Sequence, residues 1–359
     1  MFLGGSRAAF RGLSRSRSML TILTILVGFL ALMLAGVLTE STTVHEWHSF
    51  SLGARSFFSG LGGGGASSSQ HSSDGGSSSS SGFSYNYAIA FQAKDRVDGV
   101  YAGLSQLDSP TGEDNYFVSV RNSHDVFAGV ADGVGGWVEH GFDSSAISRE
   151  LCSSMLDLST NLTKKPLSPK QLLDLAYTKI KNDGKVQVGG TTAIVAHFTP
   201  NGTLKLANLG DSWCGVFRNA KLVFQTKFQT VGFNAPYQLA IIPQDIVRKA
   251  AQKGGSYIQN QPKDADEYNF KLQKDDIIVL ATDGVTDNIA TGDMELFLSN
   301  NAESGGLQEL TQKFVTQVVK LSKDPTFPSV FSQEMSKLYG RPYLGGKEDD
   351  ITVVVIKAT

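Results

Sequence analysis

The chain has 359 residues, of which 41% are hydrophobic, and its formal net charge is −2. This length and apolar content exclude a chain that is disordered throughout, and they allow one large domain or two ordinary ones. The nearly balanced charge gives no sign of a nucleic-acid-binding surface, so we expect no nucleic-acid partner. The two cysteines, Cys152 and Cys214, are too few for a disulfide framework or a four-ligand zinc site, and we expect buried free thiols.

The N-terminus has the pattern of a targeting or anchoring segment. Four arginines lie within the first 17 residues, and an uncharged, almost wholly apolar run follows over residues 19–38. About 20 helical residues span a hydrocarbon core of ~30 Å, so this run predicts a transmembrane helix. An arginine- and serine-rich start without acidic residues is also typical of a mitochondrial presequence. Residues 1–40 are therefore predicted to be a targeting segment that is either retained as an anchor or removed.

Residues 41–83 have the composition of a flexible linker. At their centre is the stretch GLGGGGASSSQHSSDGGSSSSSG, which cannot bury enough apolar surface to fold. About 25 residues of this kind have an end-to-end distance on the order of 25 to 30 Å. Such a linker would let a folded domain move above a membrane.

Residues 84–359 contain strand and helix patterns without another linker, and they predict one folded domain. Runs rich in β-branched and aromatic residues predict strands at 85–91, 116–121, 126–131, 191–198, 203–208, 213–218, 277–281 and 351–356. Apolar periodicity and capping residues predict helices at 144–158, 169–181, 244–253, 306–322 and 329–338.

The order of these elements indicates the fold class. Strands come in adjacent pairs, and Asn201 with Gly202, and Asn219 with Ala220, are typical of hairpin turns. Helices also come in adjacent pairs. This order favours antiparallel sheets flanked by helical hairpins over a parallel, doubly wound sheet. Two polar, Pro- and Gly-containing stretches, 232–243 and 254–276, are predicted to be surface loops that govern substrate specificity.

Acidic residues stand next to predicted strands in five short motifs. The motifs are GEDNYF from residue 112, GVADGVGGW from 129, NLGDSW from 208, ATDGVTDN from 281 and KEDDITVVV from 347. A single Asp-Gly pair such as Asp132 with Gly133 is usually a turn, and each of the other carboxylates alone could serve a turn or the surface. Asp283 stands out, because it follows a buried-looking strand where an unpaired charge would be costly.

Carboxylates at the ends of several strands can converge on one point of a fold. They would repel one another unless a cation neutralised them. Hard divalent cations take oxygen ligands, so the set predicts a magnesium or manganese site. The six histidines show no His-x-x-x-His pattern, which argues against a histidine-based metal site.

Together with GGTTA from residue 189, these motifs resemble, in order and spacing, those of metal-dependent protein phosphatases of type 2C. The resemblance covers residues 84–359, and GVADGVGGW is similar to the branch that includes the mitochondrial Ptc-seven homologues. It implies an α+β fold, a four-layer αββα sandwich with two central antiparallel sheets flanked by helix pairs. It also implies a serine/threonine protein phosphatase, in which a water that bridges the metal ions attacks phosphoserine or phosphothreonine.

The resemblance further implies which residues hold two Mg²⁺ or Mn²⁺ ions. Asp132 would bridge the ions, and Gly133 would contribute its backbone carbonyl, since a residue without a Cβ allows a close approach. Asp283 and Asp349 would be the other direct carboxylate ligands. Asp132, Asp283 and Asp349 are therefore the predicted catalytic group.

Five further acidic residues receive supporting roles by the same resemblance. Glu113 would act on metal-bound water and belongs to the predicted metal site. Asp211 matches an aspartate that in some members helps to hold a third ion. Asp114, Asp287 and Asp350 are expected beside the metal ligands rather than on the metal.

Two positions depart from the family pattern. Many members have a histidine directly after the Asp-Gly pair, where it can protonate the leaving alkoxide, and Val134 stands there instead. Loss of a general acid typically costs 10²- to 10⁴-fold in rate, so metal-bound water or His140 would have to supply the proton. Many members also have an arginine four residues before the Glu-Asp pair to hold phosphate. Ser109 stands there, and Arg121 or Arg341 are the candidates to replace it.

These departures leave a second hypothesis open, a catalytically weak pseudophosphatase that acts as a membrane-tethered phosphoprotein-binding module. We favour the enzyme, because a decaying site usually loses metal carboxylates and all of them remain here. Phosphoprotein substrates, and a membrane contacted through the N-terminal segment, are the expected partners. The arginine-rich start and the family branch favour a mitochondrial location over chloroplast or endomembrane.

Overall fold

The computed structural model describes residues 82–96, 109–161, 167–301 and 305–359. The predicted transmembrane helix at 19–38 and almost the whole linker lie outside these residues. Within the described ranges, no helix has both the length and the apolar character that a membrane crossing requires. The two ends of the described domain meet, since Ser84 and Thr359 exchange two backbone hydrogen bonds of 2.9 and 2.8 Å.

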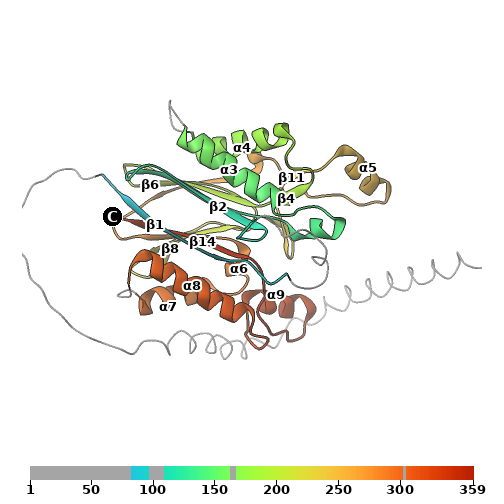
Figure 1. The fold of residues 1–359 in the computed structure, drawn as a ribbon. Coiled ribbons are helices and arrows are strands. Elements are labelled where there is room, and N and C mark those ends of the chain that lie inside the picture. Colours follow the sequence, from blue (N-terminus) through green and yellow to red (C-terminus); the bar gives the residue numbers. More distant parts are fainter. Residues whose placement is uncertain (1–81, 97–108, 162–166, 302–304) are drawn as a thin grey trace, which may run out of the picture. The chain divides into compact units, whose positions relative to one another are not determined.

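Two five-stranded antiparallel sheets form the centre of the domain (Figure 1). The first sheet has the strand order β1 (Tyr85–Gln92), β14 (Ile351–Ala358), β13 (Ile277–Ala281), β7 (Trp213–Arg218) and β8 (Lys221–Gln225). The second has the order β12 (Asp266–Lys271), β6 (Thr203–Leu209), β5 (Ala193–Phe198), β3 (Asp125–Asp132) and β2 (Asp114–Asn122). Two short pairs join β9 (Thr230–Gly232) to β10 (Ala235–Pro236) and β4 (Gly189–Thr191) to β11 (Leu239–Ile241).

Helices cover the outer face of each large sheet, as Figure 1 shows. α3 (Ala146–Thr160) and α4 (Pro169–Asp183) bury their apolar sides against the second sheet. α7 (Thr291–Asn300) and α8 (Leu307–Ser322) do the same against the first. The connections hold α5 (Gln244–Gln252), α6 (Asp283–Thr286), α9 (Val330–Tyr339) and the 3₁₀ turns η2 (Gly135–His140) and η3 (Pro262–Asp264). The predicted αββα sandwich of the α+β class is confirmed.

The core between the two sheets is wholly apolar at its centre. Val130 and Ile194 from the second sheet meet Leu280 and Val354 from the first, and all four side chains are fully buried. Strands buried on both faces explain the nearly continuous apolar runs of β3, β5, β13 and β14. A sandwich of this kind gives the loops at its ends a rigid base.

Local signals in the sequence account for several boundaries. Ser168 caps α4 by accepting from the Gln171 N–H (3.2 Å), and the Gln171 side chain accepts from the Ser168 N–H (3.0 Å). Both predicted hairpin turns are confirmed, with positive φ at Gly202 (72°), Asn219 (51°) and Ala220 (59°).

The predicted loops are partly wrong. The stretch 232–243 contains β10 and β11, and the stretch 254–276 contains β12. β12 was missed because it is an edge strand whose polar residues alternate with half-buried aromatic ones, so its sequence has little apolar content. The exposed strand β8 and the helix α7 were also missed.

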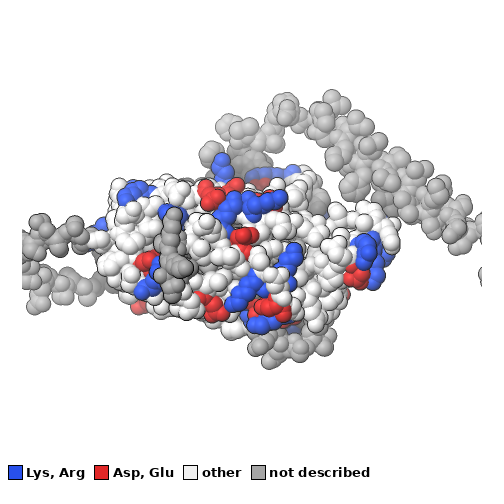
Figure 2. Space-filling model, turned by 90° about the horizontal axis from the view of Figure 1, so that it is seen from above, with Lys and Arg blue, Asp and Glu red and all other residues white. Residues whose placement is uncertain are grey.

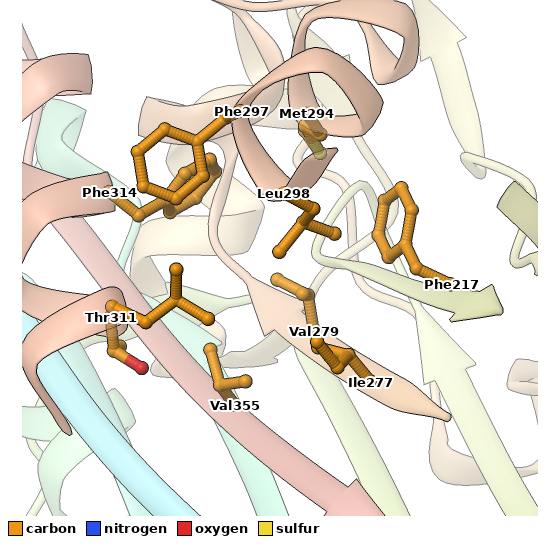
Figure 3. A pocket seen from close by; sticks show the side chains of 10 residues that line it. Phe217, Ile277, Val279, Met294, Phe297, Leu298, Thr311, Phe314 and Val355 are labelled. Carbon is orange, nitrogen blue, oxygen red and sulfur yellow. The ribbon is translucent and has the colours of Figure 1, made fainter. Parts of the chain in front are cut away.

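The space between α7, α8 and the first sheet is a packing gap. Its volume is about 20 Å³, room for roughly one water molecule. The side chains around it, seen in Figure 3, are apolar except for Thr311. It therefore offers no site for a substrate or a cofactor.

Charges of both signs are interspersed on the face shown in Figure 2. Exposed ion pairs such as Lys179 with Asp157 (3.3 Å) and Lys185 with Glu150 (3.2 Å) join neighbouring segments. Exposed pairs contribute at most about 1 kcal/mol each. The charges that constrain the fold are those buried at the end of the sandwich.

Candidate metal centre

The acidic motifs come together at one end of the two sheets. β2 begins at Asp114 and β3 ends at Asp132, and the antiparallel register places these two residues directly opposite each other. On the first sheet, Asp283 opens α6 just after β13, and Asp349 precedes β14. The Thr282 hydroxyl donates to Asp114 Oδ2 (2.7 Å), which ties the two sheets together at this end. Like charges directly opposite each other on neighbouring strands are destabilising, so positive charge is needed near Asp114 and Asp132.

Glu113 is buried, with only 2% of the residue exposed, and several polar groups hold its carboxylate. Its Oε1 accepts from the Ser144 hydroxyl (2.6 Å), and its Oε2 lies 2.9 Å from Lys94 Nζ and 3.1 Å from Arg96 Nη2. Its backbone carbonyl accepts from the Gly133 N–H (3.0 Å). A buried carboxylate held by this many donors has one defined orientation.

Asp350 organises the backbone around Glu113. Its carboxylate accepts from the Glu113 N–H (2.8 Å) and the Lys94 N–H (2.9 Å), and it binds the Arg96 guanidinium through both oxygens. The bidentate pair with arginine is the strongest geometry available to a carboxylate. Asp350 is thus positioned to orient Glu113, and its place beside the metal ligands stays a prediction.

Asp283, Asp287 and Asp349 meet around the ammonium group of Lys347. Nζ lies 2.7 Å from Asp283 Oδ2 and 3.3 Å from Asp349 Oδ2, and it also pairs with Asp287. The other oxygen of Asp349 lies 2.8 Å from Lys94 Nζ. Two lysines therefore hold Asp349 from opposite sides.

The electrostatics reflect this crowding. Burial and the nearby carboxylates, Asp283 first among them, raise the pKa of Asp132 well above its usual range. Burial and the same neighbour raise the pKa of Asp211 to about 8 and that of Asp287 to about 7. Burial also acts to raise the pKa of Asp349, but Lys347 and Lys94 outweigh it and the pKa is lowered. Burial is the largest cause of each raised pKa, and it prevails even at Asp287, which pairs with Lys347.

Gly133 lies where only glycine fits. A Cβ at this position would come within 2.5 Å of the Ser144 carbonyl and 2.6 Å of the Glu113 carbonyl. The preceding carbonyl, that of Asp132, accepts from the Thr192 N–H and the Thr191 hydroxyl, both at 2.9 Å. Asp132 and Gly133 are thereby locked between β2 and β4.

The donor set suits a divalent cation. All the gathered ligand atoms are hard oxygens, and Asp211 Oδ1 is buried without a hydrogen-bond partner in the described part of the chain. As they stand, no three His, Cys, Asp or Glu side chains among the described residues are grouped as they would be around an ion. Basic side chains from Lys94, Arg96 and Lys347 lie between the carboxylates instead.

Val134 and His140 lie at a hollow next to this centre. The hollow has a volume of about 280 Å³, and Trp137 and Tyr257 line it with their rings 5.2 Å apart. The His140 ring lies 6.2 Å from that of Trp137 and lines the same hollow. His140 packs here with aromatic neighbours, and its role as proton donor stays a prediction.

Neither of the predicted replacement arginines belongs to the centre. Arg121 pairs with Asp125 (2.9 Å), at the end of the β2–β3 hairpin opposite to Asp132. About seven residues of strand separate the two ends, or roughly 23 Å at ~3.3 Å per residue. Arg341 lies against Tyr343, to whose hydroxyl its Nε donates (2.7 Å). Neither of these contacts involves the acidic residues of the centre, whereas Arg96 contacts Glu113 and Asp350.

Known proteins are similar to this chain in sequence and in fold. A family model described as stage II sporulation protein E (SpoIIE) matches residues 122–359. A Saccharomyces cerevisiae protein, protein phosphatase 2C homolog 7, mitochondrial, is 64% identical over 283 residues, which cover 77% of this chain and 82% of the yeast protein. The chain belongs to the type 2C family of metal-dependent protein phosphatases. It is thus a serine/threonine protein phosphatase, as its motifs implied.

Two further relatives agree with this assignment. The protein phosphatase PTC7 homolog of Xenopus laevis is 33% identical over 247 residues, covering 68% of this phosphatase and 80% of the frog protein. The X-ray structure of the photosystem II phosphatase PBCP superposes with a TM-score of 0.61 at 27% identity. It covers 77% of this phosphatase and 99% of that chain.

Sequence reasoning missed four residues of the phosphatase centre. Lys94 and Arg96 follow β1 in a stretch without any motif, and Ser144 was predicted only as the first residue of a helix, whereas α3 begins at Ala146. Lys347 was visible as the first letter of KEDDITVVV, but a lysine beside acidic residues is usually a surface residue. The only sequence signal for these four residues was therefore the position of Lys347, two residues before the predicted ligand Asp349.

Gly112→Ala should disrupt the centre through Asp350. Gly112 has a φ of +73°, and a Cβ there would come within 2.2 Å of Asp350 Oδ1, so the carboxylate would have to move. Gly184→Ala is the matched control, because its φ is +70° and nothing lies within 4 Å of its Cβ. We expect Gly112→Ala to lower the free energy of unfolding by about 1 to 3 kcal/mol more than the control, measured by urea denaturation.

Metal-dependent hydrolysis of a phosphopeptide supplies the second measurement. It should fall at least about tenfold in Gly112→Ala, since displacing a catalytic group by about 1 Å can cost still more. The control should keep its activity. Equal effects in the two variants would show that Asp350 does not hold the centre together.

Proposed function

We propose that this phosphatase binds two Mg²⁺ or Mn²⁺ ions and hydrolyses phosphoserine and phosphothreonine in proteins. Asp211 matches the aspartate that in some family members helps to hold a third ion. The proposed metal ligands are Glu113, Asp132, the Gly133 carbonyl, Asp211, Asp283 and Asp349. The observation that carries the proposal is the burial of Asp132 among other carboxylates, which raises its pKa and would favour a bound cation. Divalent ions in such a site supply a water nucleophile with a lowered pKa and neutralise charge on the phosphate.

The chain's own residues divide the remaining work. Asp132, Asp283 and Asp349 form the proposed catalytic group, since they come from three separate segments of the chain and lie near enough to interact electrostatically. Glu113, oriented by Ser144, is proposed to accept a proton at Oε1 or Oε2. Asp114, Asp287 and Asp350 are proposed to orient these groups through their contacts with Thr282, Lys347 and Arg96.

Lys94 and Arg96 are proposed to contact the substrate's phosphate. Both side chains lie at Glu113 Oε2, so their charge reaches the place where a phosphate would meet the carboxylates. The guanidinium of Arg96 would take the part of the arginine that family members carry at the position of Ser109. Arginine suits this part because its fork of donors matches phosphate oxygens.

Asp132→Asn should abolish metal-dependent hydrolysis and leave the fold intact. A bridging carboxylate contributes several kcal/mol through the ions it holds, so a phosphothreonine peptide should be hydrolysed at least about 10³-fold more slowly. The measurement is phosphate release with EDTA, Mg²⁺ or Mn²⁺. Asp174→Asn, an exposed position on α4, is the control and should act as wild type. Equal inertness of wild type and Asp132→Asn towards peptides that they nevertheless bind would favour the pseudophosphatase.

Arg96→Met should lower kcat/KM for a phosphopeptide by at least about 10- to 100-fold and should raise KM. Loss of one charged hydrogen bond to a phosphate costs about 1.5 to 3 kcal/mol, and the variant also removes the bidentate partner of Asp350. Arg121→Met is the control, since it removes an arginine from a partly buried pair at the opposite end of the β2–β3 hairpin. A KM that rises equally in both variants, or in neither, would contradict the assignment to Arg96.

We also propose that the phosphatase is mitochondrial and is anchored by residues 19–38. The arginine-rich start and the mitochondrial designation of the yeast relative support this location. Deleting residues 1–38 should abolish mitochondrial import and release the protein from membranes, because the apolar run and its basic flank are then gone. Cell fractionation followed by a high-salt wash measures both effects. Persistent pelleting of the truncated chain with membranes at high salt would contradict the anchor.

A further inference from the structure

Lys347 occupies the middle of the carboxylate cluster rather than its rim. Its ammonium contacts Asp283, Asp287 and Asp349 at once, and only 17% of its side chain is exposed. Two of these partners are proposed metal ligands, so any role of Lys347 in metal binding rests on the proposed function. Three partly buried carboxylates surround this one ammonium, so Lys347 is their shared counter-ion.

We propose that Lys347 is an internal counter-cation that competes with divalent ions for Asp283 and Asp349, and thereby sets the affinity of the site for metal. The ammonium lies 2.7 Å from an oxygen of Asp283 and 3.3 Å from an oxygen of Asp349. An ion bound by the same carboxylates at ~2.0 to 2.2 Å would lie within a few Å of this ammonium. Cations that close together repel strongly in a buried site, so metal binding requires Lys347 to move.

The backbone of Lys347 is clamped, which confines this movement to the side chain. Its N–H donates to Asn288 Oδ1 (2.9 Å), and its carbonyl accepts from Asn288 Nδ2 (2.8 Å). Asn288 itself is buried and also donates to the Gly284 carbonyl (2.8 Å). The four-carbon stem of lysine is flexible, so the head can leave while the chain stays in place.

The ammonium of Lys347 also has partners that are not carboxylates. Nζ is 3.3 Å from Asn234 Oδ1 and 5.5 Å from the centre of the Phe331 ring. An amide oxygen and an aromatic face are both favourable partners for an ammonium. Lys347 can therefore give up Asp283 and Asp349 without becoming an unpaired buried charge.

Lys347→Met tests the competition, because methionine keeps a similar shape without the charge. Titration of the purified 359-residue chain with Mn²⁺ alone, followed by calorimetry, should give a Kd at least about tenfold lower than that of wild type. The melting temperature in EDTA should fall, because the carboxylates lose their counter-ion. In saturating Mn²⁺ this deficit should vanish or reverse.

Two further variants separate charge from fold. Lys347→Arg keeps a cation and should bind Mn²⁺ within about threefold of wild type, and it also decides the question if Lys347→Met fails to fold. Lys337→Met removes an exposed lysine of α9 and should change neither the affinity nor the melting temperature.

Three results would overturn the inference. They are unchanged or weaker Mn²⁺ binding by Lys347→Met, an equal loss of melting temperature in EDTA and in Mn²⁺, and tighter Mn²⁺ binding by Lys347→Arg. A wild-type chain that neither binds Mn²⁺ nor hydrolyses phosphopeptides would overturn the proposed function as well. If wild type binds Mn²⁺ and hydrolyses phosphopeptides, and Lys347→Met binds Mn²⁺ with the same Kd, only the proposed competition by Lys347 would be overturned.

Discussion

The structure depends on one unfavourable interaction, the repulsion among carboxylates that the sheet register forces together. Asp114 and Asp132 face each other across β2 and β3, and Asp283 and Asp349 join them from the other sheet. Burial strengthens the repulsion because it removes the water that would screen it. The basic side chains at this end of the sandwich can all be understood as responses to it. Asp349 shows this most directly, since its pKa is lowered where two lysines meet it.

Relaxation of the chain cannot relieve this repulsion, because the backbone at the centre has no room to move. A Cβ on Gly284 would come within 2.0 Å of the Asp350 carbonyl, and one on Gly133 would meet two carbonyls. Such close contacts between segments fix the distances among the carboxylates to a narrow range. Cations must therefore offset the repulsion among the carboxylates. The rigid backbone makes this repulsion unavoidable, and it also keeps the carboxylate oxygens together as a site that favours cations.

Much of this could be predicted from sequence, and the part that could not has a physical reason. The carboxylates were predictable because each stands at a strand end in a short local motif, and the sandwich followed from paired strands and paired helices. Arg96 was not predictable, since its partner Asp350 lies 254 residues away and no local pattern links them. The polar edge strand β12 was missed for a related reason, because its pairing with β6 compensates for its low apolar content.

The choice between arginine and lysine at the centre follows from what each cation must do. Arg96 binds both oxygens of Asp350, and the planar guanidinium suits a contact that has to keep its geometry. Lys347 and Lys94 are point charges on flexible stems, and they contact the carboxylates proposed to take metal. A lysine head can exchange one oxygen partner for another at little cost, whereas a bidentate arginine loses two aligned hydrogen bonds at once. The chain thus places arginine where the framework must persist and lysine where, on the competition proposed for Lys347, partners must change.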